Sequence, residues 1–205
     1  MIDFYTASSS NGQRVAIMLE ECGLPYTRHK LDLFAGDQKK PDFLAINPAG
    51  AIPAIVDRAG PEARTVTLAQ SGAILLYLAA KTGRFLAADL ASRAEAAQWV
   101  FQATTDVAAA SGAIFLLSQI APEKSAANVA FFEERTLRFL RVADRRLADR
   151  RYLAGDLSIG DFALYPICVV RRPLIDRAGD LPNLVRWADE MAARPGVERG
   201  MHAAD

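Results

Sequence analysis

Apolar positions follow two different periods along this chain. Up to Gly83, short strand-like runs alternate with stretches of helical spacing, and after Arg84 only the helical period recurs. Strands are predicted at residues 2–5, 26–33, 54–57 and 65–68. Helices are predicted at three places: around Val15, Met18, Leu19 and Cys22 before a stop at Gly23, over residues 42–46, and from Ser71 to Gly83. The resulting order, β-α-β-α-β-β-α, is typical of a small α/β layer.

The second half of the chain reads as helices alone. One helical stretch contains Trp99, and another carries apolar residues from Phe132 to Leu147 along one face. Ser158 and Asp161 fit an S-x-x-D capping box, and the flanking apolar residues fit a hydrophobic staple, so a helix is predicted to start there. The pattern predicts an α/β domain at 1–83, a linker at 84–91 and an all-helical domain at 92–205.

Composition and charge narrow the classes of function. The 205 residues contain 24 Lys and Arg and 24 Asp and Glu, so no basic excess favours nucleic acid. The N-terminus lacks the pattern of a signal peptide, and the longest apolar run, Ala73 to Ala80, is too short to span a bilayer. We therefore expect a soluble, unexported protein. Cys22 and Cys168 are expected to be core residues and not a disulfide.

The turn Ser8-Ser9-Ser10-Asn11-Gly12 is the first candidate for chemistry. It lies between a predicted strand and a predicted helix, where unpaired backbone N–H groups and the helix dipole favour an anion. Hydroxyl and amide donors there could hold a thiolate and lower its pKa. Ser and Asn are also the usual residues of helix caps and turns, so these residues by themselves leave both interpretations open.

Two further loops offer groups to the same region. Pro53 immediately precedes a predicted strand, where a cis peptide would turn the Ile52 backbone outward; an ordinary trans proline opening an edge strand is the alternative. Gln70 and Ser71 begin a predicted helix and offer donors to a carboxylate. His29 and His202 have no partners at metal-ligand spacing, so no metal site is expected.

Five blocks of sequence together resemble a known family. They are Tyr5 through Asn11-Gly12 to Tyr26; Gly36-Asp37-Gln38 with Pro41-Asp42-Phe43-Leu44; Asn47-Pro48 through Ile52-Pro53 to Asp57; Gln70-Ser71 to Leu78; and Ser158-Ile159-Gly160-Asp161. Over essentially its full length the chain resembles a glutathione transferase, most closely the bacterial nu-class group. The resemblance implies a thioredoxin-like N-terminal domain, an all-helical C-terminal domain and a glutathione site.

The resemblance also implies roles for individual residues. Ser9 and Asn11 become the thiolate-stabilising candidates, and Gln38 is expected at the glycyl end of glutathione. Ile52, before a cis Pro53, is expected to pair with the cysteinyl backbone, and Ser71 to bind the γ-glutamyl carboxylate beside Gln70. Three positions depart from the expected pattern. Family members usually have an acidic residue where this chain has Gln70, and the nu-class group has a lysine where it has Ala51 and an arginine where it has Phe131. Arg14, Lys39 or Lys40 are candidates to compensate.

For the second domain the resemblance implies a partner subunit and a second substrate. Asp106 is a candidate to cross a homodimer interface to the ligand amine. The run from Ala108 to Leu117 is expected to wall a pocket for a hydrophobic electrophile, although core packing explains its composition equally well. Trp99 is expected in the core. Three functions follow: cytoplasmic transfer of glutathione to an electrophile, glutathione-dependent disulfide reduction, and binding without catalysis.

Overall fold

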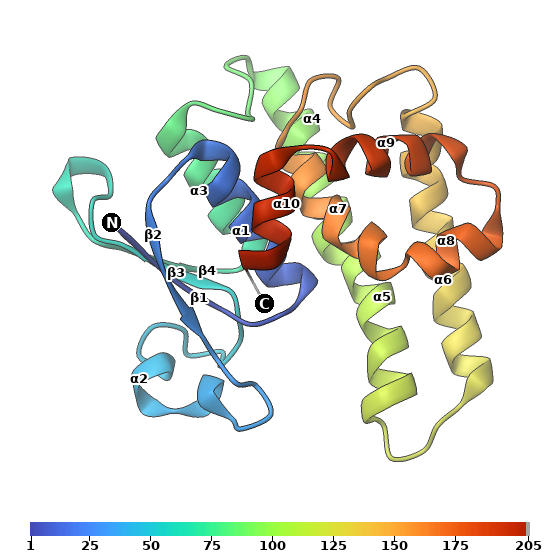
Figure 1. Cartoon of the computed structure of the whole chain (residues 1–205), viewed down its shortest axis with the longest axis horizontal. Helices are drawn as coiled ribbons and strands as arrows, with labels where there is room; N and C mark the ends of the chain where they lie inside the picture. Colours follow the sequence, from blue (N-terminus) through green and yellow to red (C-terminus); the bar gives the residue numbers. More distant parts are fainter. Residues whose placement is uncertain (204–205) are drawn as a thin grey trace. The chain divides into compact units, whose positions relative to one another are not determined.

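The computed structural model describes residues 1–203. The chain forms two compact units, one comprising Met1–Ala87 and the segment from Ala192 onward, the other Ala88–Met191 (Figure 1). The sequence instead predicts one helical domain at 92–205. The compact units differ from this prediction because the last helix packs within the first unit. The domain boundaries 1–83, 84–91 and 92–205 stay a prediction.

The first unit is built on a four-stranded mixed sheet of order β2-β1-β3-β4. Strand β1 (Ile2–Thr6) pairs in parallel with β2 (Tyr26–Lys30) and antiparallel with β3 (Ala54–Asp57), which pairs antiparallel with β4 (Val66–Ala69). The predicted order of strands and helices is confirmed. Strand β2 ends earlier than predicted because the Asp32 carboxylate accepts hydrogen bonds from the N–H groups of Phe34 and Ala35 and turns the chain.

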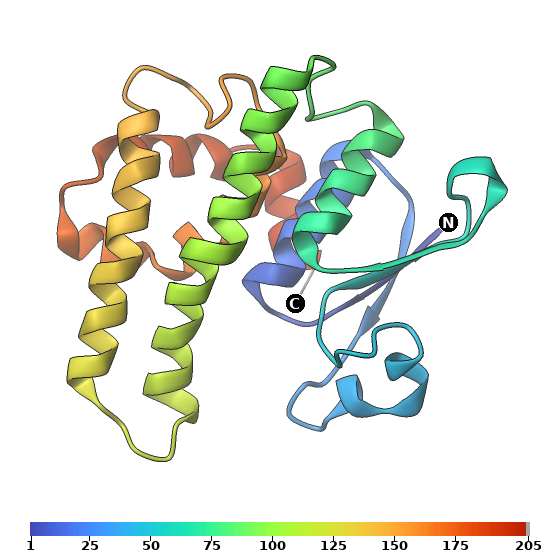
Figure 2. The ribbon, with the colours of Figure 1, turned by 180° about the vertical axis from the view of Figure 1, so that it is seen from behind.

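Helices cover both faces of this sheet (Figures 1 and 2). Helix α1 (Ser10–Cys22) and helix α3 (Ser71–Thr82) lie side by side on one face, and both end in a left-handed glycine, Gly23 and Gly83. The 3₁₀ turn η1 (Asp37–Lys39) and the short helix α2 (Pro41–Leu44) lie on the other face, where Phe43 joins a buried cluster. Successive side chains of β1 point to opposite faces of the sheet, so this strand contributes to the packing on both faces.

The C-terminal helix α10 (Pro195–Ala203) packs on α1 within the first unit. Gly200 makes this possible, because a Cβ atom there would collide with the backbone of Ile17. Ion pairs join the same segments: Arg194 binds Glu21 at 2.7 Å and 2.9 Å, and Arg199 binds Glu20 at 2.8 Å. Helix α1, which begins at the candidate anion site, is therefore fixed along its length.

A buried carboxylate ties helix α3 to the sheet. Asp57, at the end of β3, accepts hydrogen bonds from the Tyr77 hydroxyl at 2.7 Å, the Lys81 Nζ at 2.6 Å and the Ala59 N–H at 3.0 Å. Burial opposes ionisation, but these bonds outweigh it, so the pKa of the Asp57 carboxyl lies below its ordinary value. Beyond β3, the 3₁₀ turn η2 (Pro61–Ala63) leads into β4.

The second unit is helical among its described residues. Its first helix is continuous over residues 90–120, as α4 (Leu90–Phe101), η3 (Gln102–Val107), α5 (Ala108–Phe115) and η4 (Leu116–Ile120), where η3 and η4 are π-helical. The remaining helices are α6 (Ala126–Arg146), α7 (Ile159–Val170), α8 (Arg172–Ala178) and α9 (Pro182–Ala192). By length and composition the 90–120 helix is long and apolar enough to cross a membrane, a test that core helices of soluble proteins also pass. The prediction that considered only Ala73 to Ala80 missed it.

The start of helix α7 contains the capping box that the sequence predicts. The Ser158 hydroxyl accepts from the Gly160 N–H, and Asp161 accepts from the Ser158 N–H at 2.9 Å. Asp161 is fully buried and also accepts from the Leu153 N–H and the Trp187 indole. Burial raises the pKa of its carboxyl, although these hydrogen bonds favour the ionised form. Trp99 is buried nearby in the core, as expected.

Candidate functional site

Ser9 lies at the start of helix α1 as its N-cap. Its backbone is extended, and its hydroxyl oxygen accepts a hydrogen bond from the Gly12 N–H at 3.1 Å. Gly12 has no room for a side chain, because a Cβ atom there would meet the Thr6 hydroxyl and the Ala7 carbonyl. The capping interpretation of Ser9 is therefore correct for its oxygen lone pair, while its hydroxyl hydrogen remains able to donate.

Asn11 follows in the first turn of α1, with its side chain exposed to solvent. Its Oδ1 accepts a 2.5 Å hydrogen bond from Nη1 of Arg14, one turn further along the helix. Arg14 itself is 1% exposed. Burial lowers the pKa of its guanidinium to about 10, which still leaves the group charged at neutral pH.

Ser71 is the first residue of helix α3, and it is only 6% exposed. Its hydroxyl oxygen accepts a 3.2 Å hydrogen bond from the same nitrogen of Arg14. Gln70, just before it, is exposed and has φ 69°, a left-handed value that costs a non-glycine residue about 1–3 kcal/mol. The chain accepts this strain at the point where the helix N-terminus presents Ser71.

Arg14 thus joins two of the predicted site residues, which are 60 positions apart in the sequence. The N-termini of α1 and α3 both carry partial positive charge, and a charged guanidinium lies between their first turns. Ser9, Asn11 and Ser71 each use an oxygen to accept a fixed hydrogen bond and keep their own hydrogens for a ligand. Such a site favours anionic groups.

The loop before β3 is held by Asn47. This buried side chain donates to the Ala51 carbonyl at 2.6 Å and accepts from the Ala49 N–H at 3.2 Å. The Ile52–Pro53 peptide bond is cis. The Ile52 side chain packs against the cluster of Leu31, Phe43 and Ala54. Among residues 1–203, the hydrogen bonds of this loop do not use the Ile52 backbone, so its N–H and C=O remain available.

Gln38 lies in the turn η1 and is tied to its own loop. Its Nε2 donates to the Leu33 carbonyl at 3.2 Å, while its buried Oε1 has no hydrogen-bond partner within the described chain. Of the two lysines considered as compensating charges, Lys40 pairs with Asp37 at 2.6 Å and Lys39 is exposed. Arg14 is therefore the candidate cation that contacts the site residues.

Other predicted residues lie in the second unit or outside this cluster. Asp106 is exposed on the π-helical segment η3, and Phe131 is exposed on α6. Within the run 108–117, Ala110, Ser111 and Ile114 are buried whereas Phe115 and Leu116 are exposed. His29 stacks on Tyr5 and contacts Asp3. No group of three metal-ligating side chains occurs in residues 1–203.

Neither cysteine belongs to the group of site residues, and Cys168 lies in the second unit. Cys168 is buried in helix α7, where burial raises the pKa of its thiol to about 12. Cys22 lies at the other end of α1 from Asn11, half-buried beside the Thr82 hydroxyl at 3.5 Å. Burial outweighs the hydrogen bond with Thr82, so the pKa of the Cys22 thiol is raised as well. Both thiols are therefore weak nucleophiles at neutral pH.

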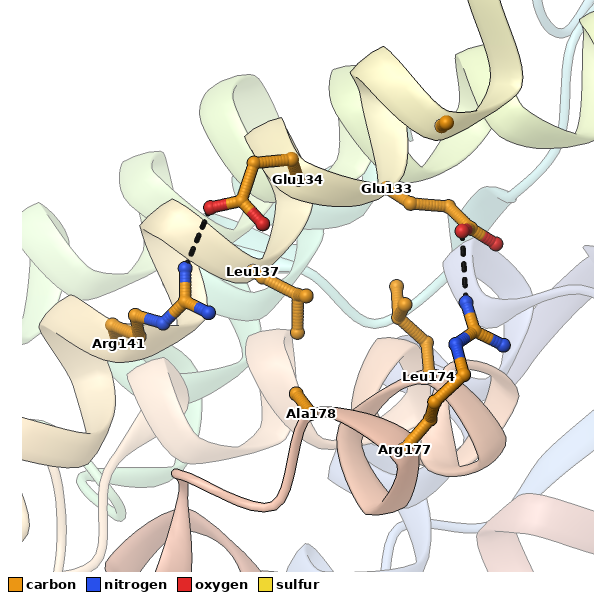
Figure 3. Close-up of a pocket in the computed structure, with 8 residues that line it drawn as sticks. Glu133, Glu134, Leu137, Arg141, Leu174, Arg177 and Ala178 are labelled. Carbon is orange, nitrogen blue, oxygen red and sulfur yellow. Dashed lines mark hydrogen bonds and ion pairs between the residues drawn. The ribbon is translucent and has the colours of Figure 1, made fainter. Parts of the chain in front are cut away.

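Two hollows on the described surface are not lined by any of the predicted glutathione-site residues. One, of about 260 Å³, lies beside Tyr5, His29 and Phe43. The other, of about 280 Å³, lies between α6 and α8, and Figure 3 shows its acids already paired. Glu133 binds Arg177 of α8 and Glu134 binds Arg141, each at 2.7–2.8 Å. These ion pairs neutralise the acids of the second hollow, and the pair of Glu133 with Arg177 joins α6 to α8.

Sequence reasoning missed the central position of Arg14, which it named only as one of three compensating cations. A signal was present in the sequence. Arg14 lies three residues after Asn11 and one before Val15, on the side of the helix that carries the buried residues Val15 and Met18. A charged residue in an apolar stripe calls for buried acceptors. Only the fold reveals that one acceptor is Ser71.

Comparison with known proteins identifies matches over both halves of the chain. The family model described as "Glutathione S-transferase, N-terminal domain" matches residues 8–81, and "Glutathione S-transferase, C-terminal domain" matches residues 104–195. The chain is 35% identical to Disulfide-bond oxidoreductase YfcG of Escherichia coli, covering 98% of this chain and 94% of YfcG. It is 28% identical to Transcriptional regulator URE2 of Saccharomyces cerevisiae, covering 97% of this chain and 66% of that protein.

Solved structures show the same fold. A glutathione transferase family member from Pseudomonas fluorescens, with two glutathione molecules bound, is 33% identical with a TM-score of 0.91, covering 98% of this chain and 92% of that one. A glutathione transferase from Pseudomonas putida, with one glutathione disulfide bound per subunit, is 31% identical with a TM-score of 0.90, covering 98% and 90%. Both similarities extend over nearly the whole of each chain.

Proposed function

Because the chain belongs to the glutathione S-transferase family, we propose that it binds glutathione on its first unit. The sulfur lies at Ser9 and Asn11, the cysteinyl backbone pairs with Ile52, and the γ-glutamyl carboxylate meets Ser71. Gln70 lies beside the ligand amine, and Gln38 lies toward the glycyl end. The observation that carries this proposal is the bridge from Arg14 to both Asn11 and Ser71, which links the two anion-favouring helix ends.

The chemical role of the site is to keep the glutathione sulfur as a thiolate. Lowering a thiol pKa by two units from about 8.5 requires about 2.7 kcal/mol of preferential stabilisation. A hydrogen bond to a charged group contributes about 1.5–3 kcal/mol, so the Ser9 hydroxyl and the Asn11 amide together supply enough. The dipole of helix α1 adds to this effect.

In the first proposed reaction the thiolate attacks a hydrophobic electrophile. A bond forms between sulfur and the electrophilic carbon, and the leaving group departs with its electron pair or, in an addition, the neighbouring atom takes up a proton. The protein contributes the thiolate fraction and the positioning, without a base of its own. The apolar run from Ala108 to Leu117 is the proposed wall of the electrophile pocket.

Titration of the bound thiol tests this assignment. The ultraviolet absorbance of the thiolate is followed against pH for the glutathione complex of the unaltered protein and of an Ser9→Ala, Asn11→Ala double variant. The double variant should raise the pKa of the bound thiol by at least about two units, because both donors are lost. An unchanged titration curve in a folded, glutathione-binding double variant refutes the assignment.

Glutathione-dependent disulfide reduction is the second proposed reaction. It is favoured by the name of the relative YfcG, by the glutathione disulfide in the Pseudomonas putida structure, and by the place of Cys22 at the end of α1 opposite to Asn11. One glutathione thiolate attacks the disulfide and releases one thiolate, which takes up a proton. A second glutathione then attacks the mixed disulfide, giving a second thiol and glutathione disulfide.

A cysteine-free variant separates this mechanism from one that uses protein thiols. The Cys22→Ser, Cys168→Ser double variant is assayed with reduced glutathione and a small dialkyl disulfide, and beside it with a model aryl halide. Both rates should stay within about twofold of the unaltered protein, because Cys22 lies at the far end of α1 from Asn11 and burial raises the pKa of both thiols. Loss of disulfide reduction in a folded double variant contradicts the cysteine-free mechanism, and the ratio of the two rates decides between the reactions.

Binding without catalysis is the third function. Ala51, Gln70 and Phe131 lack the charges that the family usually has, and one relative, URE2, is described as a transcriptional regulator. Losing two partly desolvated ion pairs weakens an anionic ligand by about ten- to a hundredfold. Detectable glutathione binding without turnover of either substrate would select this function.

A second copy of the chain is the proposed macromolecular partner, in the cytoplasm. The second unit exposes large apolar side chains on α4, η4 and α6, including Phe101 at 58%, Leu116 at 55% and Phe131 at 62%. Exposed groups of this size mark surfaces that bind other molecules. Asp106 is proposed to reach the partner's ligand. Light scattering should give twice the chain mass, and a monomer would remove both the dimer and this role of Asp106.

A further inference from the structure

The guanidinium of Arg14 is the feature that the proposed function does not yet explain. One nitrogen, Nη1, donates to Asn11 Oδ1 at 2.5 Å and to Ser71 Oγ at 3.2 Å. The side chain is 1% exposed, so its burial carries a desolvation cost. A guanidinium has five donors and no acceptor, so the direction of both hydrogen bonds is fixed.

For Asn11, the direction of this hydrogen bond determines which end of the carboxamide faces Arg14 and which end faces solvent. The oxygen must face Arg14, because the amide NH₂ group has no acceptor there. The NH₂ group is therefore the end left toward solvent, and it can only donate. An asparagine without such a neighbour presents either its oxygen or its NH₂ group to a ligand.

The same reasoning applies to the Ser71 hydroxyl. Its oxygen accepts from Arg14, so its own hydrogen is left to donate to a ligand at the N-terminus of α3. The Ser9 hydroxyl is oriented in the same sense by the Gly12 N–H. All three side chains are thereby fixed as donors, which suits a thiolate and a carboxylate and disfavours ligands that offer only donors.

We infer that Arg14 is a positioning residue that fixes Asn11 and Ser71 as donors and so couples the sulfur end of the glutathione site to its γ-glutamyl end. This inference rests on the proposed function, because it assigns the two ends to one ligand. Arg14 also compensates in part for the absence of positive charges at Ala51 and Phe131, because it keeps a buried cation between the two helix ends. Arg14 acts through its neighbours and need not touch the ligand.

Two substitutions of Arg14 test the donor argument. Arg14→Met removes the donors at similar length, and Arg14→Lys keeps a donor-only cation. In Arg14→Met the glutathione dissociation constant should rise at least about tenfold, and the pKa of the bound thiol should also rise, because Asn11 and Ser71 can turn. Arg14→Lys should recover part of both losses. Equal losses in both variants, or none in a folded Arg14→Met, overturn the inference.

Arg171→Met is the control for loss of a guanidinium that donates to a serine hydroxyl. Arg171 is half-buried in the second unit and donates to Ser111 through Nε at 2.8 Å and Nη2 at 2.6 Å. The Arg171→Met variant should lower the urea midpoint as Arg14→Met does, yet leave the glutathione dissociation constant and the thiol pKa unchanged. If the dissociation constant instead rises equally in both variants, the effect is a general loss of stability, and that result counts against a positioning role for Arg14.

Asn11→Asp tests the inference without changing Arg14 and covers the case in which the Arg14 variants do not fold. The aspartate keeps its bond to Arg14 but presents a second acceptor oxygen to the sulfur. The bound thiol pKa should therefore rise further in Asn11→Asp than in Asn11→Ala, by at least about one unit. Equal shifts in the two variants contradict the donor argument.

The outcomes separate this inference from the proposed function. If the unaltered protein binds glutathione and the Arg14 and Asn11 variants behave as the control does, the inference fails and the proposed function stands. If the unaltered protein binds neither reduced nor oxidised glutathione at millimolar concentration, the proposed function fails and the inference fails with it.

Discussion

Replacing Ser9 by alanine separates capping from catalysis, because the chain contains a second serine with the same capping geometry. Ser9 Oγ accepts from the N–H three residues ahead at 3.1 Å, and Ser125 Oγ, at the start of α6, does so at 3.2 Å. Loss of either cap should lower the free energy of unfolding by about 1 kcal/mol. Ser125→Ala is therefore the matched control for Ser9→Ala.

The catalytic effect should appear in Ser9→Ala alone. Loss of one hydrogen bond to a thiolate is worth about 1.5–3 kcal/mol, which corresponds to a rise of about one to two units in the bound thiol pKa. With Asn11 still present and a bound thiol pKa that starts near about 6.5, the thiolate fraction at pH 7 and the turnover rate should fall by about three- to twenty-fivefold. Ser9→Thr keeps the hydroxyl and should restore both values.

Urea unfolding and ultraviolet titration of the glutathione complex measure the two effects on the same samples. The expected pattern is equal destabilisation of the two alanine variants, with a changed thiol pKa in Ser9→Ala only. If Ser9→Ala is destabilised like Ser125→Ala but its thiol pKa matches the unaltered protein, Ser9 is a cap and nothing more, and the role given to its hydroxyl hydrogen is refuted.

Three further changes test the scaffold that carries the site. Asp161→Ala leaves the Leu153 N–H, the Ser158 N–H and the Trp187 indole without their acceptor and should lower the free energy of unfolding by about 3–5 kcal/mol in urea; a loss below about 1 kcal/mol would contradict the buried network. Gly200→Ala forces α10 away from α1 and should cost about 1–3 kcal/mol, whereas Gly112→Ala, with open space around it, should gain up to about 1 kcal/mol; equal effects would refute the close approach. Because the pKa of Asp57 is lowered in the folded state, its stabilisation is complete above its unfolded pKa of about 3.9 and is lost as pH falls through the folded value. Asp57→Asn should therefore flatten the acid limb of the stability curve, and an unaltered acid limb would count against this assignment.

Local pattern was sufficient to predict most of the first unit. The strand and helix order follows from apolar spacing and from stops such as Gly23 and Gly83, which depend on neighbouring residues only. The packing of α10 on α1 was not predictable in the same way. Ion pairs such as Glu21 with Arg194 join residues far apart in sequence, and charge alone does not tell which acid meets which arginine.

The candidate site shows the same division. The strand–turn–helix pattern marked the turn around Ser9 and Asn11 and the helix start at Ser71 as possible anion sites, and the resemblance to glutathione transferases then selected these three residues. The hydrogen-bond polarity of Asn11 and Ser71 depends on Arg14, whose side chain reaches from α1 to α3, and a sequence pattern does not specify such a contact. The 90–120 helix was underestimated for a related reason, because scattered polar residues interrupt its apolar runs.

Calorimetric titration of the unaltered protein with reduced and with oxidised glutathione tests the central claim most directly. Binding should be detected below millimolar concentration, and for reduced glutathione it should release protons at neutral pH, because the site takes the sulfur as a thiolate. Repeating the titration in buffers of different ionisation enthalpy measures that release. No heat from either ligand at millimolar concentration, or binding without proton release, would contradict a site built to hold the glutathione thiolate.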